Sequence, residues 1–326
     1  MRRRTVVTLM VAGSLLAAGA SATAQAPATA ARVGILTGAP RSSPVWQAFD
    51  KRMRELGWID GQNLHVEFRH ATDKVEQLPG LAADLAPGVD LIVVSGSDFV
   101  LRTAKQVAGR RPIVMVAVDY DPLSLGLIDS LARPGGNVTG VFLRRRELTP
   151  KQLELLKEAI PRARRVAVVW DSTSADLLKA ARQAGPSLKL ELRELELRGP
   201  PYDFNGALRE AARGRADAAL MIGGGGLAFQ HRAQIAQFAL THRIPTMFTF
   251  AEYAEAGGFM AYGADVADMF RRGAEYVDRI LRGAKPADLP VEQPNKFQLV
   301  LNMKTARSLG LTPPMSIRLR ADRVIE

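Results

Sequence analysis

Arg133-Pro-Gly-Gly-Asn-Val-Thr-Gly-Val-Phe142 is the stretch on which we base the fold assignment. Pro134 lacks a backbone N–H donor, and the Gly135-Gly136 pair accepts positive φ values that other residues avoid. The residues that follow favour β-structure, so the stretch predicts a hinge that leads into a strand. A second glycine pair, Gly257-Gly258, precedes another apolar run and predicts a second hinge near a return crossing.

The same alternation of short apolar runs and amphipathic segments lies on both sides of this stretch. Such runs predict buried parallel strands whose two faces are covered by helices. We expect helices at 123–132 and 227–241, among others. The fold class is therefore α/β, with two doubly wound parallel-sheet lobes joined by hinge crossings and a cleft between them. Residues 32–143 with about 264–294 form the first lobe, and residues 144–263 with about 295–326 form the second.

The first 24 residues have the features of a secretory signal peptide. Arg2, Arg3 and Arg4 precede an apolar core too short to span a bilayer, and Ala22-Thr23-Ala24 offers small residues for cleavage. We therefore expect an exported, periplasmic protein. The sequence of 326 residues contains no cysteine, which excludes disulfides, a thiolate metal site and a lipid-anchored cysteine.

The formal net charge of +11 includes three signal-peptide arginines. Positive charge attracts acidic partners, including nucleic acid. The basic residues are scattered, however, and the longest later run, Arg144-Arg145-Arg146, has no interleaved aromatic residues for base stacking. We interpret the run as solvated surface and expect no nucleic-acid binding.

The run Gly223-Gly224-Gly225-Gly226-Leu227-Ala228 fits G-x-G-x-x-A between an expected strand and an expected helix. The dinucleotide fingerprint also requires an acidic residue about 20 positions later, and here the next one is Glu252. A flexible loop or a tight turn is the alternative. The four histidines never show metal-binding spacing, so we expect neither a metal nor a cofactor.

Polar and glycine residues gather where the expected strands end. In an open parallel sheet, ligands bind beyond the carboxyl ends of the strands. Backbone N–H groups at helix starts there suit a carboxylate, carboxylate side chains suit an ammonium group, and aromatic rings suit an apolar body. The candidate ligand-binding residues are Thr37, Gly38, Gly96, Ser97, Asp119, Tyr120, Asp121, Trp170, Asp171, Ser172, Gly224, Phe250 and Glu252.

Roles can be assigned to some of these candidates. We expect Ser97 and its neighbours to bind a carboxylate, Asp121 or Asp171 to bind an amine, and Trp170 to contact the ligand body. The alternative is that the acidic residues cap helices and that Trp170 and Phe250 belong to the core. No spacing of carboxylates supports catalysis, so no catalytic residue is expected.

Several motifs together resemble the ABC transporter substrate-binding proteins related to tryptophan- and tyrosine/phenylalanine-binding lipoproteins. They sample the chain from residue 32 to residue 326 and are Leu56-Gly57-Trp58, Gly61-Gln62-Asn63-Leu64, Asp121-Pro122, Leu131-Ala-Arg-Pro-Gly-Gly-Asn-Val-Thr-Gly140, Glu255-Ala-Gly-Gly258, Tyr262-Gly263, Leu289-Pro-Val-Glu-Gln-Pro294, Asn302-Met-Lys-Thr-Ala306 and Leu309-Gly310.

The resemblance implies a type I periplasmic-binding-protein fold whose lobes close on a small solute. It implies delivery of that solute to a membrane permease with its ATPase, and no catalysis. The motifs are specific for the family rather than for a ligand, and our own expectation is a small carboxylate-bearing ligand, an amino acid or an aromatic acid. We expect a monomer, and the missing lipidation cysteine indicates a protein that is free in the periplasm.

Two other classes of protein remain open. One is an exported α/β enzyme that uses the glycine run for a nucleotide. The other is the core of a ligand-sensing regulator, which shares the two-lobed plan. The absence of N-terminal DNA-binding helices and the predicted signal peptide count against the regulator.

Overall fold

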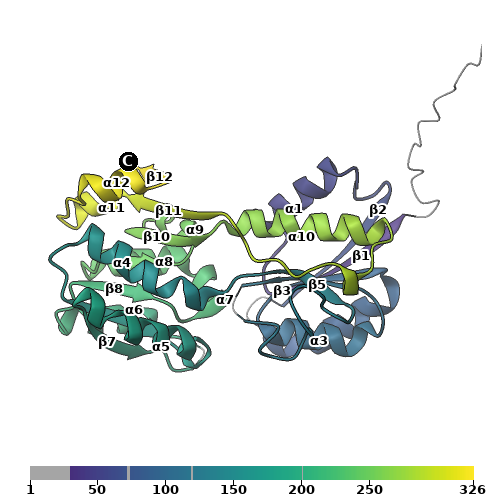
Figure 1. Ribbon diagram of the computed structural model, residues 1–326, viewed down its shortest axis with the longest axis horizontal. Coiled ribbons are helices and arrows are strands. Elements are labelled where there is room, and N and C mark those ends of the chain that lie inside the picture. The colour runs from purple at the N-terminus through teal and green to yellow at the C-terminus, as the bar shows by residue number, and fades with distance from the viewer. Residues whose placement is uncertain (1–29, 72–73, 119, 200) are drawn as a thin grey trace, which may run out of the picture.

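The computed structural model describes residues 30–71, 74–118, 120–199 and 201–326. The predicted signal peptide at 1–24 and the candidate Asp119 lie outside the described residues. Two lobes, each built on its own sheet, lie side by side along the longest axis of the molecule (Figure 1). This arrangement confirms the α/β fold class with two parallel-sheet lobes.

The first lobe contains a five-stranded parallel sheet in the order β2-β1-β3-β4-β5. Its central strands β3 and β4 are short runs of β-branched and other apolar residues, and they are buried on both faces, as expected for a covered parallel sheet. The strands are β1 (Ala31–Thr37), β2 (Leu64–His70), β3 (Leu91–Gly96), β4 (Ile113–Ala117) and β5 (Val138–Phe142).

Helices cover both faces of this sheet. On one face, α1 packs against α10, and Trp46 of α1 meets the Phe270 ring of α10 edge-on at 4.8 Å. On the other face, α2 and α3 pack against each other and against the sheet. These elements are α1 (Pro44–Glu55), α2 (Leu78–Leu85), α3 (Asp98–Ala108), α10 (Val266–Leu281) and the 3₁₀ turns η1 (Val75–Gln77), η2 (Ala86–Gly88) and η6 (Pro286–Asp288).

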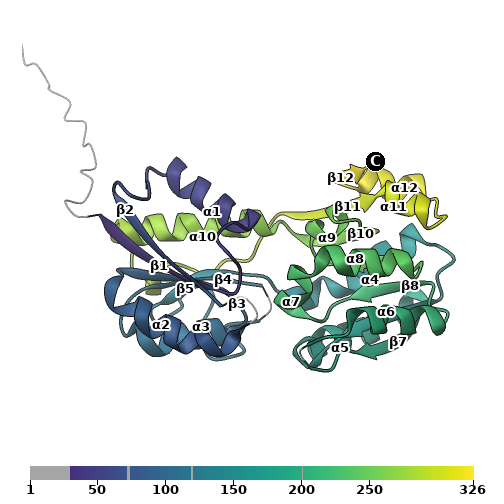
Figure 2. The same ribbon diagram turned by 180° about the vertical axis from the view of Figure 1, so that it is seen from behind.

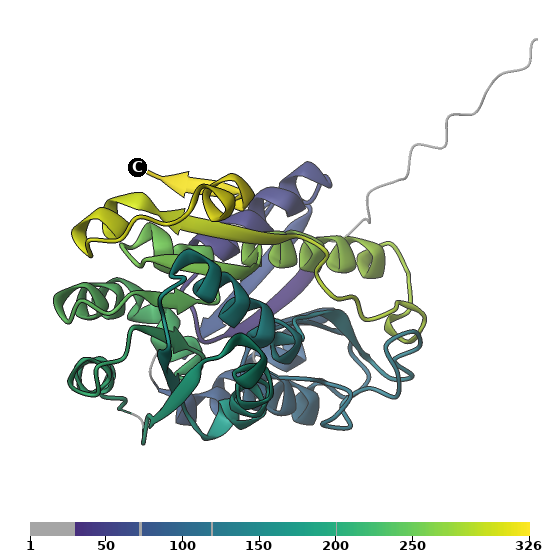
Figure 3. The same cartoon turned by 60° about the vertical axis from the view of Figure 1, so that its left-hand side comes forward.

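The second lobe contains a seven-stranded sheet in the order β12-β11-β10-β9-β8-β6-β7. Its pairs are parallel except β10 with β11, which is antiparallel. Figure 3 shows the C-terminal strands, in yellow, along the upper edge of this lobe. The strands are β6 (Arg165–Trp170), β7 (Glu191–Glu196), β8 (Ala218–Met221), β9 (Thr246–Phe248), β10 (Met260–Ala264), β11 (Phe297–Asn302) and β12 (Arg323–Ile325).

Helices also cover both faces of the second sheet: α4 is in front in Figure 1, and α8 is in front in Figure 2. The helix expected at 227–241 is divided at His231 into α7 and α8. The helical elements are η3 (Arg145–Glu147), α4 (Thr149–Ala159), η4 (Ser172–Ser174), α5 (Ala175–Ala184), η5 (Pro186–Leu188), α6 (Phe204–Arg213), α7 (Gly225–Gln230), α8 (Arg232–Thr241), α9 (Ala251–Glu255), α11 (Met303–Ser308) and α12 (Met315–Arg320).

The helix expected at 123–132 is absent, and the segment forms a series of turns instead. The Asp121 carboxylate accepts hydrogen bonds from the backbone N–H groups of Leu123 and Ser124, which begins a turn. Gly126 then takes a φ of +65°, outside the right-handed helical region. The apolar residues of this segment therefore pack locally from a series of turns and do not form a helix.

Within the described residues, three stretches of chain connect the lobes: one from β5 to η3, one from β10 to α10, and one from the linker after η6 to β11. They lie beside one another, because Phe142 N–H donates to Glu292 O at 3.0 Å and Asp265 N–H donates to Lys296 O at 3.1 Å. Lys296 Nζ also lies 2.9 Å from Asp268 Oδ1 at the start of α10. These bonds tie the second and third connections together at the first lobe.

The predicted hinge positions at the glycine pairs are wrong. Gly135-Gly136 precedes β5, whereas the chain leaves the lobe at the other end of that strand, after Phe142. Gly257-Gly258 likewise precedes β10, whose far end leads to the second connection. The glycine pairs permit turns at strand starts, and the chain crosses between the lobes at strand ends.

Candidate functional site

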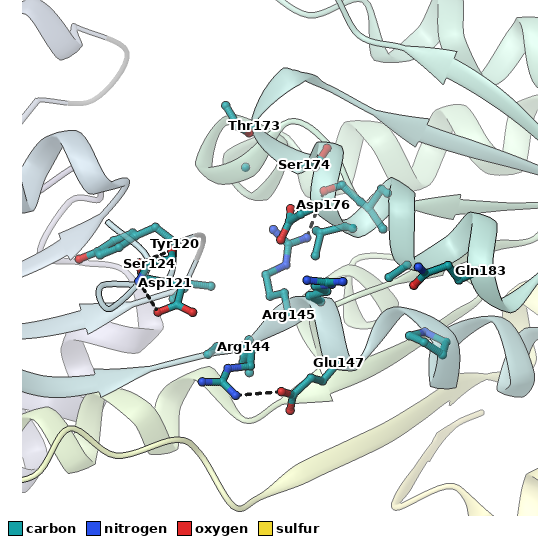
Figure 4. A pocket seen from close by; sticks show the side chains of 18 residues that line it. Tyr120, Asp121, Ser124, Arg144, Arg145, Glu147, Thr173, Ser174, Asp176 and Gln183 are labelled. Atoms are coloured by element: carbon teal, nitrogen blue, oxygen red, sulfur yellow. Dashed lines mark hydrogen bonds and ion pairs between the residues drawn. The ribbon is translucent and has the colours of Figure 1, made fainter. Parts of the chain in front are cut away.

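A cavity of about 660 Å³ lies between the lobes, beside the first connection (Figure 4). The first lobe contributes the loop after β4, and the second lobe contributes η4 and one face of α5. The residues that line it are Val118, Tyr120, Asp121, Ser124, Leu143, Arg144, Arg145, Arg146, Glu147, Pro150, Thr173, Ser174, Asp176, Leu177, Ala180, Gln183, Ile222 and Gly225.

Figure 4 shows how the two sides of the cavity face each other. Tyr120 and Asp121 lie on the side of the first lobe, and Ser174 and Asp176 lie on the side of the second. The first connection passes between them and carries Arg145. Of the predicted ligand-binding residues, the structure thus places Tyr120 and Asp121 on the cavity wall.

Asp171 is adjacent to the cavity, but its carboxylate is engaged by the protein. The side chain is buried, and Oδ1 accepts hydrogen bonds from the hydroxyl groups of Thr173 and Ser174 at 2.8 and 3.0 Å and from Ser174 N–H at 3.0 Å. Oδ2 accepts from Gly224 N–H at 2.8 Å. Asp171 therefore caps η4 and holds the glycine loop after β8. This is the helix-capping alternative, although its predicted contact with an amine stays a prediction.

Electrostatics around Asp171 agree with this bonding. Burial opposes ionisation, but the hydrogen bonds from Gly224, Thr173, Ser174 and Tyr202 keep the pKa of the Asp171 carboxyl below its ordinary value. Burial, together with the neighbouring carboxylate of Asp171, raises the pKa of Tyr202 to about 12. The carboxylate is thus ionised at neutral pH, and the phenol remains a hydrogen-bond donor.

The glycine loop is shaped by close packing. A Cβ atom at Gly223 would lie 2.6 Å from the backbone carbon of Trp170, and Gly224 has a φ of +88°. These two positions require glycine for steric and conformational reasons. Because the Gly224 N–H is already bonded to Asp171 and α7 is only six residues long, the loop does not present the phosphate-binding helix start of a dinucleotide site.

Two of the predicted aromatic residues, Trp170 and Phe250, lie near the cavity but do not line it. Trp170 is half-buried against the cluster formed with α4 and α5, and its Nε1 atom is buried without a hydrogen-bond partner among the described residues. Phe250 is buried, with its ring 5.9 Å from that of Phe229. Both contacts fit the core alternative. Glu252, in the first turn of α9, has its pKa raised, chiefly by burial.

The remaining candidates lie at strand ends outside the cavity wall. Thr37 is buried, and its Oγ1 accepts a hydrogen bond from Ala39 N–H at 3.2 Å; Gly38 follows it. Gly96 has a φ of +133°, and Ser97 begins α3 without a side-chain capping bond. Ser172 is exposed at the start of η4. The ligand contacts predicted for these residues stay predictions.

The sequence interpretation missed Arg144, Arg145 and Arg146, which all line the cavity. Arg144 forms an ion pair with Glu147 at 3.0 Å. Arg145 Nη2 lies 3.2 Å from the carbonyl oxygen of Ile222 and 3.4 Å from Thr249 Oγ1, so it connects the ends of β8 and β9. One signal was available: the run directly follows the carboxyl end of a parallel strand, where ligands bind.

Sequence reasoning also missed Asp176 and Gln183, which α5 presents to the cavity. Both side chains are exposed, and neither they nor Arg146 form a hydrogen bond or ion pair within the described part of the chain. The cavity wall therefore carries groups of both charges that are not engaged by the protein.

Within residues 30–326, apart from the positions not described, no helix is both long and apolar enough to cross a membrane. The same part of the chain holds no group of three or more side chains arranged to bind a metal ion.

Comparisons with known proteins agree with the resemblance seen in the sequence. The tyrosine-binding protein of Clostridioides difficile (strain R20291) is 23% identical over 269 residues, 81% of this chain and 76% of that protein. A structure described as an ABC domain from Streptococcus pneumonia in complex with L-Trp has a TM-score of 0.79 and 22% identity, and the match covers 91% of this chain and 100% of that one. The structure of a conserved domain protein from Vibrio cholerae has the same TM-score, the same identity and the same coverage of both chains.

The structural matches confirm the fold of two parallel-sheet lobes. The family model described as "ABC transporter substrate binding protein" matches residues 39–325, which is most of the sequence. The chain therefore belongs to the ABC transporter substrate-binding protein family, whose members bind substrates rather than act as enzymes.

Proposed function

We propose that this protein is the solute-binding component of an ABC importer and that it captures a small carboxylate-bearing ligand, an amino acid or an aromatic acid, between its lobes. The observation that carries the proposal is the cavity of about 660 Å³ lined from both lobes, with three consecutive arginines on its wall. Its size falls within the range of about 300–1,000 Å³ that is usual for small-molecule sites.

Arg146 is the residue best placed to bind the carboxylate. Arg146 lines the cavity and is exposed, and no described residue pairs with its side chain. Arginine binds carboxylates through two parallel N–H donors, which gives both affinity and orientation. Arg145 is held by Ile222 and Thr249, so it adds positive charge from a fixed position.

An ammonium group of the ligand would face Asp176 or Asp121. Asp121 Oδ1 already accepts backbone hydrogen bonds from Leu123 and Ser124, and the oxygens of Asp171 are likewise engaged. Asp176 carries an unpaired carboxylate on the opposite wall. We therefore assign the ammonium group to Asp176 and retain Ser97 and the glycines of the first lobe as contacts made when the lobes close.

The rest of the proposal concerns transport. The tyrosine-binding relative and the L-Trp complex support an amino acid or an aromatic acid as ligand. The predicted signal peptide at 1–24 supports a periplasmic location, from which a monomer delivers its ligand to a membrane permease. We also retain the division into 32–143 with about 264–294 and 144–263 with about 295–326 as the two bodies that close on the ligand.

A thermal-shift screen of the mature protein tests this function. The probes are L-tyrosine, L-tryptophan, benzoate and ATP. A probe present at 100 times its dissociation constant adds about 2.7 kcal/mol of stability, which raises the melting temperature by several degrees. A shift with an amino acid or with benzoate supports the proposal. A shift with ATP alone would replace it with the nucleotide-using enzyme.

A further inference from the structure

One face of α5 runs along the cavity wall. Asp176, Ala180 and Gln183 are spaced by four and three residues, so they lie on the same side of the helix, and all three line the cavity. At about 1.5 Å of rise per residue, Asp176 and Gln183 are about 10 Å apart along the helix axis. The cavity therefore extends along about two turns of α5.

The two ends of this face differ chemically. Asp176 offers a carboxylate at one end, and Gln183 offers an amide with both a donor and an acceptor at the other. Arg146, on η3, lines the same cavity. Ala180 lies between the ends and is buried, so the middle of the face has only a methyl group.

Closure of the lobes does not change the spacing along this face. Asp176, Ala180 and Gln183 belong to a single helix, and η3 packs against both α5 and α4 of the same lobe. A ligand that lies along α5 would meet these groups at the same separation in the open and closed forms. Movement of the first lobe covers the ligand from the opposite side.

We propose that the α5 face takes a ligand of dipeptide length, with its ammonium group at Asp176 and its carboxylate at Gln183 and Arg146. The proposal rests on the function proposed above and narrows its ligand class. Because an extended chain advances about 3.5 Å per residue, a free amino acid leaves most of the 10 Å between the polar ends unfilled, whereas a dipeptide spans about 7 Å. Hydrogen bonds from the side chains cover the remaining distance.

Calorimetric titration tests the proposal with paired probes, L-tyrosine and L-tryptophan against L-alanyl-L-tyrosine and L-alanyl-L-tryptophan, and with benzoate as a further carboxylate. We expect each dipeptide to bind at least tenfold more tightly than its parent amino acid. If an amino acid or benzoate binds and the dipeptides bind more weakly, the ligand-length proposal is overturned while the solute-binding function stands. If none of these probes binds, the ligand-length proposal and the proposed solute-binding function both fail.

Two variants locate the effect on α5. Ala180→Leu places a larger side chain in the middle of the face and should reduce the dipeptide preference at least fivefold. Asp176→Asn removes the charge that faces the ammonium group, without adding bulk, and should also reduce it. The matched control is Ala175→Leu, which makes the same change at an exposed position outside the cavity wall. A preference that is equal in all four proteins would contradict the assignment to α5.

Discussion

Asp171 Oδ2 accepts a hydrogen bond from Gly224 N–H at 2.8 Å, which joins the loop after β6 to the loop after β8. Tyr202, from the segment before α6, donates to the same carboxylate. One buried acidic side chain therefore fixes three chain segments at the carboxyl edge of the second sheet. This edge borders the cavity, so the position of the α5 face depends on Asp171 although the residue does not line the cavity.

Removal of this carboxylate should destabilise the protein. Asp171→Ala leaves the N–H groups of Gly224 and Ser174 without their acceptor inside the fold. We expect the free energy of unfolding to fall by about 3 kcal/mol, as measured by urea denaturation. Asp176→Ala is the control, because Asp176 is exposed and unpaired within the described chain, and should change it by less than about 0.5 kcal/mol. Equal effects of the two changes would refute the structural role of Asp171.

The contribution of Asp171 should also depend on pH. Its pKa in the folded protein is below the ordinary value of 3.8, so the unfolded state takes up the proton first as pH falls. The stabilisation is thus fully present above the unfolded pKa and is lost as pH falls through the folded pKa. The stability difference between the wild type and Asp171→Asn should shrink between pH 5 and about pH 3. A difference that stays constant or grows over this range would show that the folded pKa is not lowered.

Replacing Gly140 or Gly136 with alanine should change the stability of the protein to different extents, because the two glycines differ in the space around them. A Cβ atom at Gly140 would lie 2.1 Å from the carbonyl oxygen of Met115, and the φ of Gly140 is +135°. Gly140→Ala should therefore lower the free energy of unfolding by about 3 kcal/mol. At Gly136, a Cβ atom would have no neighbour within 4 Å.

Gly136→Ala should change stability by less than about 1 kcal/mol and leave ligand affinity within twofold, since this residue is at the end of β5 remote from the connection. Urea denaturation and calorimetry measure both quantities. A large loss of affinity in Gly136→Ala, with stability retained, would restore the original prediction of a hinge at Gly135-Gly136.

The sequence predicted the lobes because their evidence is local. Short apolar runs such as Ile113–Ala117 become buried parallel strands in whatever order they pair. The direction of β5 was not used in the hinge prediction, although a parallel strand must leave the sheet at its carboxyl end. The prediction of a helix at 123–132 was wrong because it followed the apolar spacing. It gave too little weight to Gly126 and to the carboxylate of Asp121, which favour a turn.

The candidate site was only partly predictable. Tyr120 and Asp121 follow a strand, and ligands of open parallel sheets bind beyond the carboxyl ends of the strands. This rule predicts their position on the cavity wall correctly. Asp176 and Gln183 reach the same cavity from a helix face, and Arg146 reaches it from a connection between the lobes. Their convergence depends on how α5 packs against η3, which no local sequence pattern records. A run of arginines has the same sequence whether it faces open solvent or a ligand cavity.

The central claim is that Arg146 binds the carboxylate of the ligand. It is tested most directly by a binding titration of the wild type and Arg146→Gln. The ligand is the strongest-binding carboxylate among L-tyrosine, L-tryptophan, benzoate and the two dipeptides. Arg209→Gln is the matched control, because Arg209 is an exposed arginine of the same lobe outside the cavity wall. We expect Arg146→Gln to weaken binding at least tenfold, about 1.4 kcal/mol, and Arg209→Gln to remain within twofold of wild type. If a folded Arg146→Gln protein binds as tightly as wild type, the cavity beside the first connection is not where the carboxylate is bound.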